Sequence, residues 1–162
     1  MTRKWVLNSS PVIILAKVSL IWILEEMCAR IVIPSGVAHE VKRGPANDVA
    51  RSWLEGAGDK HVVRIESVDA RVAAWDLGRG ESEVISIAYI SPEHEAILDD
   101  RAARKCAQAL GIRVRGTVGV LLAAKRAGVL PQIAPILAQL PGHGLRLGKD
   151  LLQAAIRLSG ET

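Results

Sequence analysis

The chain has 162 residues and a formal net charge of +4, and 49% of its residues are hydrophobic. This length suffices for one domain with a full core. The two cysteines, Cys28 and Cys106, are far apart and in no CxxC spacing, so we expect neither a zinc site nor a secreted disulfide framework, while the basic charge is compatible with a polyanionic partner.

In the first half of the chain, short apolar runs alternate with helix-forming segments. The predicted elements, in chain order, are a buried strand at 5–7, a helix from Pro11 that continues in some form through Leu24, a buried strand at 31–33, a helix at 37–42, a helix opening at Asp48 and an edge strand at 61–65.

The second half repeats the alternation and ends in helices. The predicted elements here are a loop at 77–80, a helix starting at Glu81, a strand at 96–98, a helix at 101–110, a strand at 112–115, a helix that Gly116 and Thr117 cap and that ends near Gly128, and two helical segments around 133–140 and 151–156.

Short strands that alternate with amphipathic helices indicate βαβ units. We therefore expect an α/β fold, a three-layer α/β/α arrangement with a mainly parallel central sheet and helices on both faces. Residues 1–162 are expected to form a single domain, with the helices from about 131 packed on it.

No membrane-spanning segment is expected. The apolar stretch 12–24 contains Lys17 and is followed by Glu25 and Glu26, whereas a spanning helix needs about 20 apolar residues. The first residues only faintly resemble a signal peptide, because Asn8-Ser9-Ser10-Pro11 breaks the apolar run. We therefore expect a cytoplasmic protein.

Polar residues follow three of the predicted strands at the point where each strand ends. Carboxyl ends of parallel strands meet at one edge of a sheet, which is where such folds bind ligands. These residues are Asn8 and Ser10 after the first strand, Asp99 and Asp100 after the fourth, and Thr117 after the fifth. Three glutamates lie in neighbouring helices: Glu40 after the second strand, and Glu81 and Glu83 before the fourth.

Carboxylates that converge on one crevice repel one another, and their pKa values rise unless a cation is present. Because the ligands are all oxygens, the pattern favours Mg²⁺ or Mn²⁺ as the metal. Such an ion can activate a water molecule and stabilise the leaving oxygen of a phosphodiester.

The same residues carry a resemblance to the PIN-domain family, covering residues 5–161. The matching segments are Asn8-Ser9-Ser10-Pro11-Val12-Ile13, Val37-Ala38-His39-Glu40-Val41, Gly80-Glu81-Ser82-Glu83-Val84-Ile85, Leu98-Asp99-Asp100-Arg101, and Gly116-Thr117-Val118-Gly119-Val120-Leu121-Leu122. The last of these resembles a prokaryotic branch of predicted nucleic-acid-binding proteins related to VapC-type toxins.

The resemblance implies a Mg²⁺- or Mn²⁺-dependent ribonuclease that acts on RNA, a cognate antitoxin and a homodimer. It assigns metal binding to Asp99, Glu40 and Glu81, with Asn8 and Ser10 as weaker ligands. One position departs from the pattern, because the family's first acidic residue is Asn8 here. An amide still offers a carbonyl oxygen but brings no charge, so catalysis could be weakened or lost.

Several alternatives stay open from the sequence alone. Glu81 and Glu83 lie two residues apart on a helix, so both are not expected to face one metal. Asp100 and Thr117 fit helix caps as well as site roles. Arg101 and Arg104 could contact phosphates or lie on a solvated helix face.

These residues are compatible with three functions to different degrees. The first is a metal-dependent endoribonuclease similar to VapC toxins, and the second is an inactive PIN module that binds RNA or a protein partner. The third, a phosphorylated receiver domain, is disfavoured because the acidic pair follows the fourth strand here and not the first.

Overall fold

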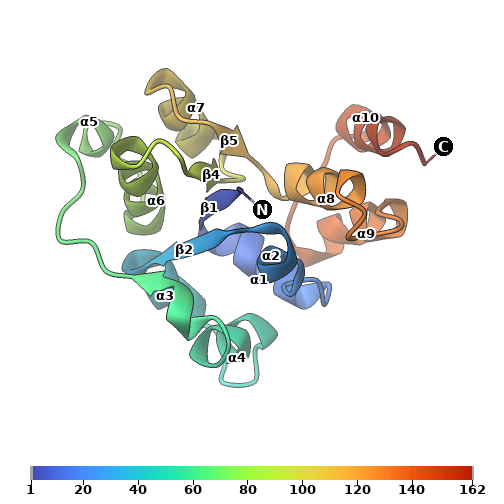
Figure 1. Cartoon of the computed structure of the whole chain (residues 1–162), viewed down its shortest axis with the longest axis horizontal. Helices are drawn as coiled ribbons and strands as arrows, with labels where there is room; N and C mark the ends of the chain where they lie inside the picture. Colours follow the sequence, from blue (N-terminus) through green and yellow to red (C-terminus); the bar gives the residue numbers. More distant parts are fainter. Residues whose placement is uncertain (1, 162) are drawn as a thin grey trace.

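The computed structural model describes residues 2–161. Its centre is a five-stranded sheet in the order β3-β2-β1-β4-β5, and every neighbouring pair is parallel (Figure 1). The strands are β1 (Lys4–Leu7), β2 (Arg30–Pro34), β3 (Val62–Val63), β4 (Glu95–Ile97) and β5 (Val114–Arg115). The predicted parallel sheet is confirmed, and the third strand lies at an edge as expected.

Helices flank the sheet and complete a three-layer α/β/α fold. They are α1 (Ser9–Lys17), α2 (Ile23–Met27), α3 (Ser35–Lys42), α4 (Val49–Glu55), α5 (Ala70–Ala73), α6 (Arg79–Ile90), α7 (Arg101–Ala109), α8 (Thr117–Arg126), α9 (Ala134–Gln139) and α10 (Lys149–Ser159), with short 3-10 turns η1 (Asp59–His61) and η2 (Leu140–His143). Helix α6 packs on α5, α7 and the central strands, whereas α1 packs on α3, α4 and α8.

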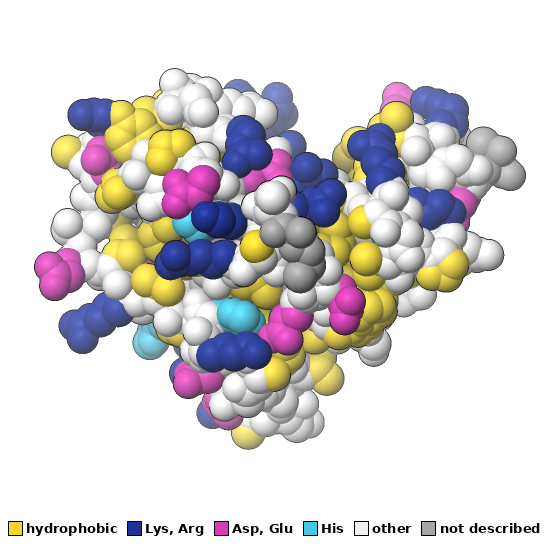
Figure 2. All heavy atoms as spheres, in the orientation of Figure 1, with side chains coloured by type: hydrophobic (Ala, Val, Ile, Leu, Met, Phe, Trp, Pro, Cys, Tyr) yellow, Lys and Arg dark blue, Asp and Glu magenta, His cyan; other side chains and the backbone are white. Residues whose placement is uncertain are grey.

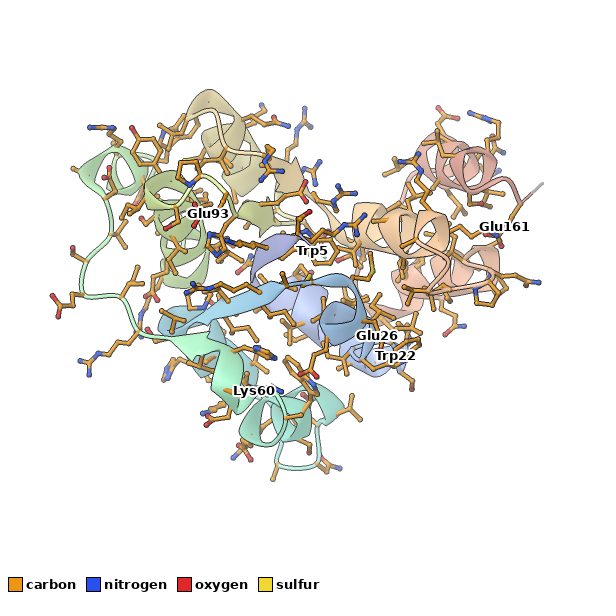
Figure 3. The ribbon with its side chains drawn as sticks, in the orientation of Figure 1. Trp5, Trp22, Glu26, Lys60, Glu93 and Glu161 are labelled. Atoms are coloured by element: carbon orange, nitrogen blue, oxygen red, sulfur yellow. The ribbon has the colours of Figure 1, made fainter. Side chains whose placement is uncertain are left out.

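The central strands form the middle of the core, because their side chains are buried on both faces of the sheet. Trp5 lies at the centre of the molecule (Figure 3) and is 1% exposed. Its indole Nε1 donates a hydrogen bond of 3.0 Å to Glu95 Oε1, so the polar atom of this large buried ring is satisfied.

The predicted extent of the first helix is wrong. In the structure, α1 starts at Ser9 and ends at Lys17, and α2 is a separate helix. The break is at Ser19, whose φ of 61° is left-handed, and the N–H of Leu20 donates to the Leu15 carbonyl at 2.8 Å. That hydrogen bond closes the end of α1 without a glycine or proline.

Other boundaries differ less. Helix α5 was not predicted and is capped by Asp69, whose carboxylate accepts from the Arg71 N–H at 2.9 Å. Helix α6 begins at Arg79, before the predicted start at Glu81. Strand β3 is shorter than predicted, since only Val62 and Val63 pair with β2.

The C-terminal helices pack on one another and on α8, and they form the lobe on the right of Figure 1. Glu161, labelled in Figure 3, accepts hydrogen bonds of 2.9–3.1 Å from the backbone N–H groups of Ile133 and Ala134 at the start of α9. It also pairs with Lys125 at 3.4 Å. Over residues 2–161, the structure contains no helix with the length and apolar character needed to cross a membrane.

Candidate active site

Several of the polar residues predicted at one edge of the sheet lie near the carboxyl ends of β1 and β4. These two strands are neighbours in the sheet, although the chain leaves β1 toward β2 and leaves β4 toward β5 on the other side. Their carboxyl ends are joined by a hydrogen bond of 3.1 Å from the Asn8 N–H to the Ile97 carbonyl. In an open parallel sheet, this change of direction opens the crevice in which ligands bind.

Asp99 is held on both carboxylate oxygens by residues from two other segments. Oδ1 accepts from the Thr117 N–H at 2.8 Å, and Oδ2 accepts from Thr117 Oγ1 at 2.6 Å and from Ser10 Oγ at 3.0 Å. Charge-assisted hydrogen bonds of this kind are strong and fix the orientation of the carboxylate. The ends of β1, β4 and β5 are thereby linked through one side chain.

Glu40 and Glu81 approach the same edge from helices α3 and α6. Glu40 Oε2 accepts from Ser9 Oγ at 2.8 Å, so the start of α1 orients it. Glu81 Oε2 accepts from the Gly78 N–H at 3.1 Å. Helix α6 therefore has a carboxylate in its first turn, where the helix dipole stabilises negative charge.

Electrostatics show which groups surround Glu81. Burial raises the pKa of the Glu81 carboxyl, and the charges of Asp100 and Glu40 raise it further. The Gly78 N–H and the Asn8 amide act in the opposite direction, because their hydrogen bonds favour the ionised form. These groups come from four different segments and face one region.

Asn8 contributes an unusual atom to this region. The side chain is 4% exposed, and its Oδ1 atom has no hydrogen-bond donor in the structure. Buried carbonyl oxygens almost always accept a hydrogen bond, so an exception calls for an explanation. A buried amide oxygen without a donor, on a side chain whose amide also hydrogen-bonds to Glu81, is suited to a cation.

The structure does not bring Glu83 to this cluster. Glu83 is 4% exposed and turns toward the start of α3, where Oε1 accepts from the Gly36 N–H at 2.9 Å and from Ser35 Oγ at 3.2 Å. Oε2 pairs with Arg79 at 2.8 Å. The structure thus separates the two glutamates of α6, with Glu81 at the cluster and Glu83 between the helices.

The remaining predicted residues lie around the cluster. Asp100 is exposed, and its Oδ2 accepts from the Ala103 N–H at 2.9 Å, so it is the N-cap of α7. Arg101 is exposed on the same helix. Arg104 is half-buried and donates to the Leu98 carbonyl at 3.0 Å. Thr117 is fully buried and begins α8.

The oxygen atoms of these side chains suit a hard divalent cation. Each carboxylate also accepts hydrogen bonds from neighbouring N–H or O–H groups. Within residues 2–161, no three His, Cys, Asp or Glu side chains are gathered closely enough to form a preformed metal site. The available oxygens belong to Asn8, Glu40, Glu81, Asp99 and Asp100. An all-oxygen set with a partly satisfied amide fits Mg²⁺ or Mn²⁺ better than softer metals.

Sequence reasoning missed the residues that position these carboxylates. Ser9 had no assigned role, yet it orients Glu40. Gly36 and Gly80 allow the α3 and α6 helices to approach, since a Cβ at either position would lie under 3.0 Å from a glutamate oxygen of the other helix. A glycine at a helix start is the only sequence signal for such contacts.

Comparison with known proteins identifies the family of this chain. Residues 4–161 match the DUF3368 family, which is described as a PIN domain. The chain therefore belongs to the PIN-domain family, as its motifs predicted. A search of curated proteins gave no match. PIN domains are in general nucleases, which agrees with an acidic cluster at the carboxyl edge of the sheet.

Proposed function

We propose that this chain is a single-domain, Mg²⁺- or Mn²⁺-dependent endoribonuclease of the VapC-like kind. The observation that carries the proposal is the set of oxygens around the carboxyl end of β1, above all the buried Asn8 Oδ1 that lacks a donor. The raised pKa of Glu81, caused by burial and then by Asp100 and Glu40, supports it, because a cation would relieve both effects.

In this proposal Asp99, Glu40 and Glu81 hold the ion, with Asn8 and Asp100 beside them. The ion, when bound, lowers the pKa of water and stabilises the charge on the phosphodiester oxygens. Ser10 and Thr117 hold Asp99 in one orientation, and Ser9 does the same for Glu40. These hydroxyls reduce the reorganisation that ligand binding would otherwise require.

The partners follow from the same proposal. The substrate is RNA, which agrees with the net charge of +4. A cognate antitoxin would keep the nuclease silent in the cytoplasm, and the chain would act as a homodimer. These three partners are carried by the VapC-like resemblance, and each is open to direct measurement.

The second candidate is an inactive PIN module that binds RNA or a protein. Asn8 favours it, because an amide at the family's first acidic position removes one negative charge from the site. The absence of a preformed three-ligand metal site across residues 2–161 favours it as well. Binding of RNA at saturating Mn²⁺ without turnover would identify this function.

The discriminating experiment is cleavage of a mixed single-stranded RNA pool with Mn²⁺. Wild-type protein, protein in EDTA, Asp99→Ala and Glu66→Gln are compared, and circular dichroism confirms folding. Glu66 is an exposed acid with no ion pair in the described chain, so its variant controls for loss of charge. The nuclease proposal expects cleavage by wild type and Glu66→Gln alone. No cleavage by folded, antitoxin-free protein would favour the binding module.

A further inference from the structure

A groove leads away from Asp99 between the body of the molecule and the C-terminal lobe. It has a volume of about 610 Å³, and its floor is the edge strand β5. Helix α8 contributes Val118 and Leu122, and the segment leading into α10 contributes Leu145 to Leu147. Figure 2 shows a notch between the two lobes with Lys and Arg side chains on both of its sides.

The groove carries a small excess of positive charge, since three arginines and two acidic residues line it. Three arginines line it, namely Arg104, Arg115 and Arg146, and its acids are Asp99 and Glu95. Arg115 pairs with Glu95 at 3.0 Å. Arg104 and Arg146 form no ion pair with any residue in 2–161, and Arg146 is exposed.

Gly116 brings the basic wall next to the acidic cluster. A Cβ at this position would lie 2.8 Å from Arg104 Nη1 and 3.1 Å from Asp99 Oδ1. A guanidinium group and the Asp99 carboxylate therefore flank the same backbone position. A phosphate held by Arg104 would lie beside the carboxylate that we assign to the metal.

The opposite wall combines an arginine with apolar side chains. Leu145 and Leu147 flank Arg146 in sequence, and Leu151 at the start of α10 is 52% exposed. Alternation of an exposed arginine with leucines offers both a phosphate contact and an apolar surface along one extended segment. Single-stranded nucleic acid presents this combination, since a charged backbone carries bases with apolar faces.

We propose that this groove binds the RNA strand that extends from the cleavage site, with Arg104 and Arg146 contacting successive phosphates. The inference rests on the proposed function for the identity of the strand. An acidic protein segment is the competing occupant. RNA is favoured because the groove is continuous with Asp99, where a phosphodiester must lie for cleavage, so one ligand would occupy both sites.

The test is fluorescence anisotropy of a labelled 12-nucleotide single-stranded RNA in EDTA, where cleavage does not complicate binding. Arg146→Ala is compared with Arg157→Ala, an exposed arginine on α10 outside the groove. Arg146→Ala is expected to raise the Kd severalfold for all sequences and to reduce the slope of log K against log salt by about 0.7. Arg157→Ala and Arg146→Lys are expected to bind like wild type.

Equal RNA affinity for Arg146→Ala and Arg157→Ala would overturn the proposal. So would an unchanged RNA affinity combined with Arg146-dependent binding of poly-glutamate, which would identify an acidic protein segment as the occupant. Failure of the nuclease proposal is a separate result. If RNA binding depends on Arg146 but the RNA is never cut with Mn²⁺, the groove proposal stands and the nuclease proposal fails. If Arg146→Ala cleaves RNA with the same kcat/KM as wild type, the nuclease proposal stands and the groove proposal fails.

Discussion

Glu40 on α3 lies against Gly80 on α6 so closely that a Cβ at position 80 would be 2.6 Å from Glu40 Oε1. The contact has a counterpart in the opposite direction. Glu83 on α6 lies against Gly36 on α3, where a Cβ would be 2.7 Å from Glu83 Oε2. At each of the two glycines, a glutamate side chain of the other helix lies close to the backbone. The two contacts set how α3 and α6 pack, and so the position of Glu40 relative to Glu81.

Gly80→Ala is expected to weaken metal binding without unfolding the protein. The new methyl group would push the end of the flexible Glu40 side chain away from Ser9, whereas alanine is favourable in a helix. We expect the Kd for Mn²⁺ to rise about tenfold, as for other losses of a supporting contact around a metal. Isothermal titration measures this effect, and Gly142→Ala, where a Cβ would meet nothing within 4 Å, is the control. Unchanged affinity for Mn²⁺ would show that Glu40 does not bind the ion.

Glu81→Gln and Glu83→Gln are expected to affect different properties, although the residues are two apart. Glu83→Gln should change stability, and Glu81→Gln should change the response to Mn²⁺. Glu83→Gln loses the ion pair with Arg79 and should lower the free energy of unfolding by about 1 kcal/mol, with its Mn²⁺ response retained. Glu81→Gln should lose most of the Mn²⁺-induced rise in Tm. Urea unfolding and thermal shifts with Mn²⁺ measure the two effects. Loss of the Mn²⁺ response only in Glu83→Gln would exchange the two roles.

The stability of the metal-free protein should depend on Glu81 ionisation. Burial, followed by the charges of Asp100 and Glu40, raises the pKa of Glu81 above its unfolded value. The folded protein then binds more protons in this range, so stability falls as pH rises from about 4.3 through the folded pKa.

In EDTA, Glu81→Gln should therefore have a higher Tm than wild type at pH 8, and the gain should disappear at pH 4. Because the side chain is partly exposed, solvent screening limits the gain to about 1–2 °C. Glu66→Gln is the control for a lost surface charge. A gain that is largest at pH 4 would contradict the assigned environment of Glu81.

Asn8→Asp should restore the family's first acidic position. In EDTA the added charge beside Glu81 is buried, so the variant should be less stable than wild type by about 1–3 kcal/mol. With Mn²⁺ the order should reverse, and the ion should bind about tenfold more tightly, equivalent to about 1.4 kcal/mol. Asn47→Asp, at an exposed site, controls for the change in net charge. Unchanged binding of Mn²⁺ would place Asn8 outside the metal site.

The sheet was predictable because its central strands are short apolar runs that end in turn-forming or acidic residues. Trp5-Val6-Leu7 and Ile31-Val32-Ile33 are buried on both faces, which is the pattern of a parallel sheet. The end of α1 at Ser19 was not predictable, because nothing in the local sequence marks a left-handed residue there. The packing of the following residues decides that conformation.

For the site, the sequence predicted which residues collect at one edge but not how each is held. Asp99 lies two residues after the end of β4, so the strand order alone brings it to the carboxyl edge of the sheet. The separate destinations of Glu81 and Glu83 depend on how α6 packs against α3, which local spacing does not encode. The place of Gly116 beside Asp99 and Arg104, and of Arg146 in the same groove, depends on tertiary packing that no local motif in the sequence encodes.

The metal site is tested most directly by counting the Mn²⁺ ions bound in solution, using electron paramagnetic resonance of free Mn²⁺ as protein is added. We expect wild type and Glu66→Gln to bind at least one ion per chain, and Asp99→Asn to bind it about tenfold or more weakly while remaining folded. Absence of bound Mn²⁺ in wild type, or equal affinity in wild type and Asp99→Asn, would contradict the claim that these carboxylates form a metal site.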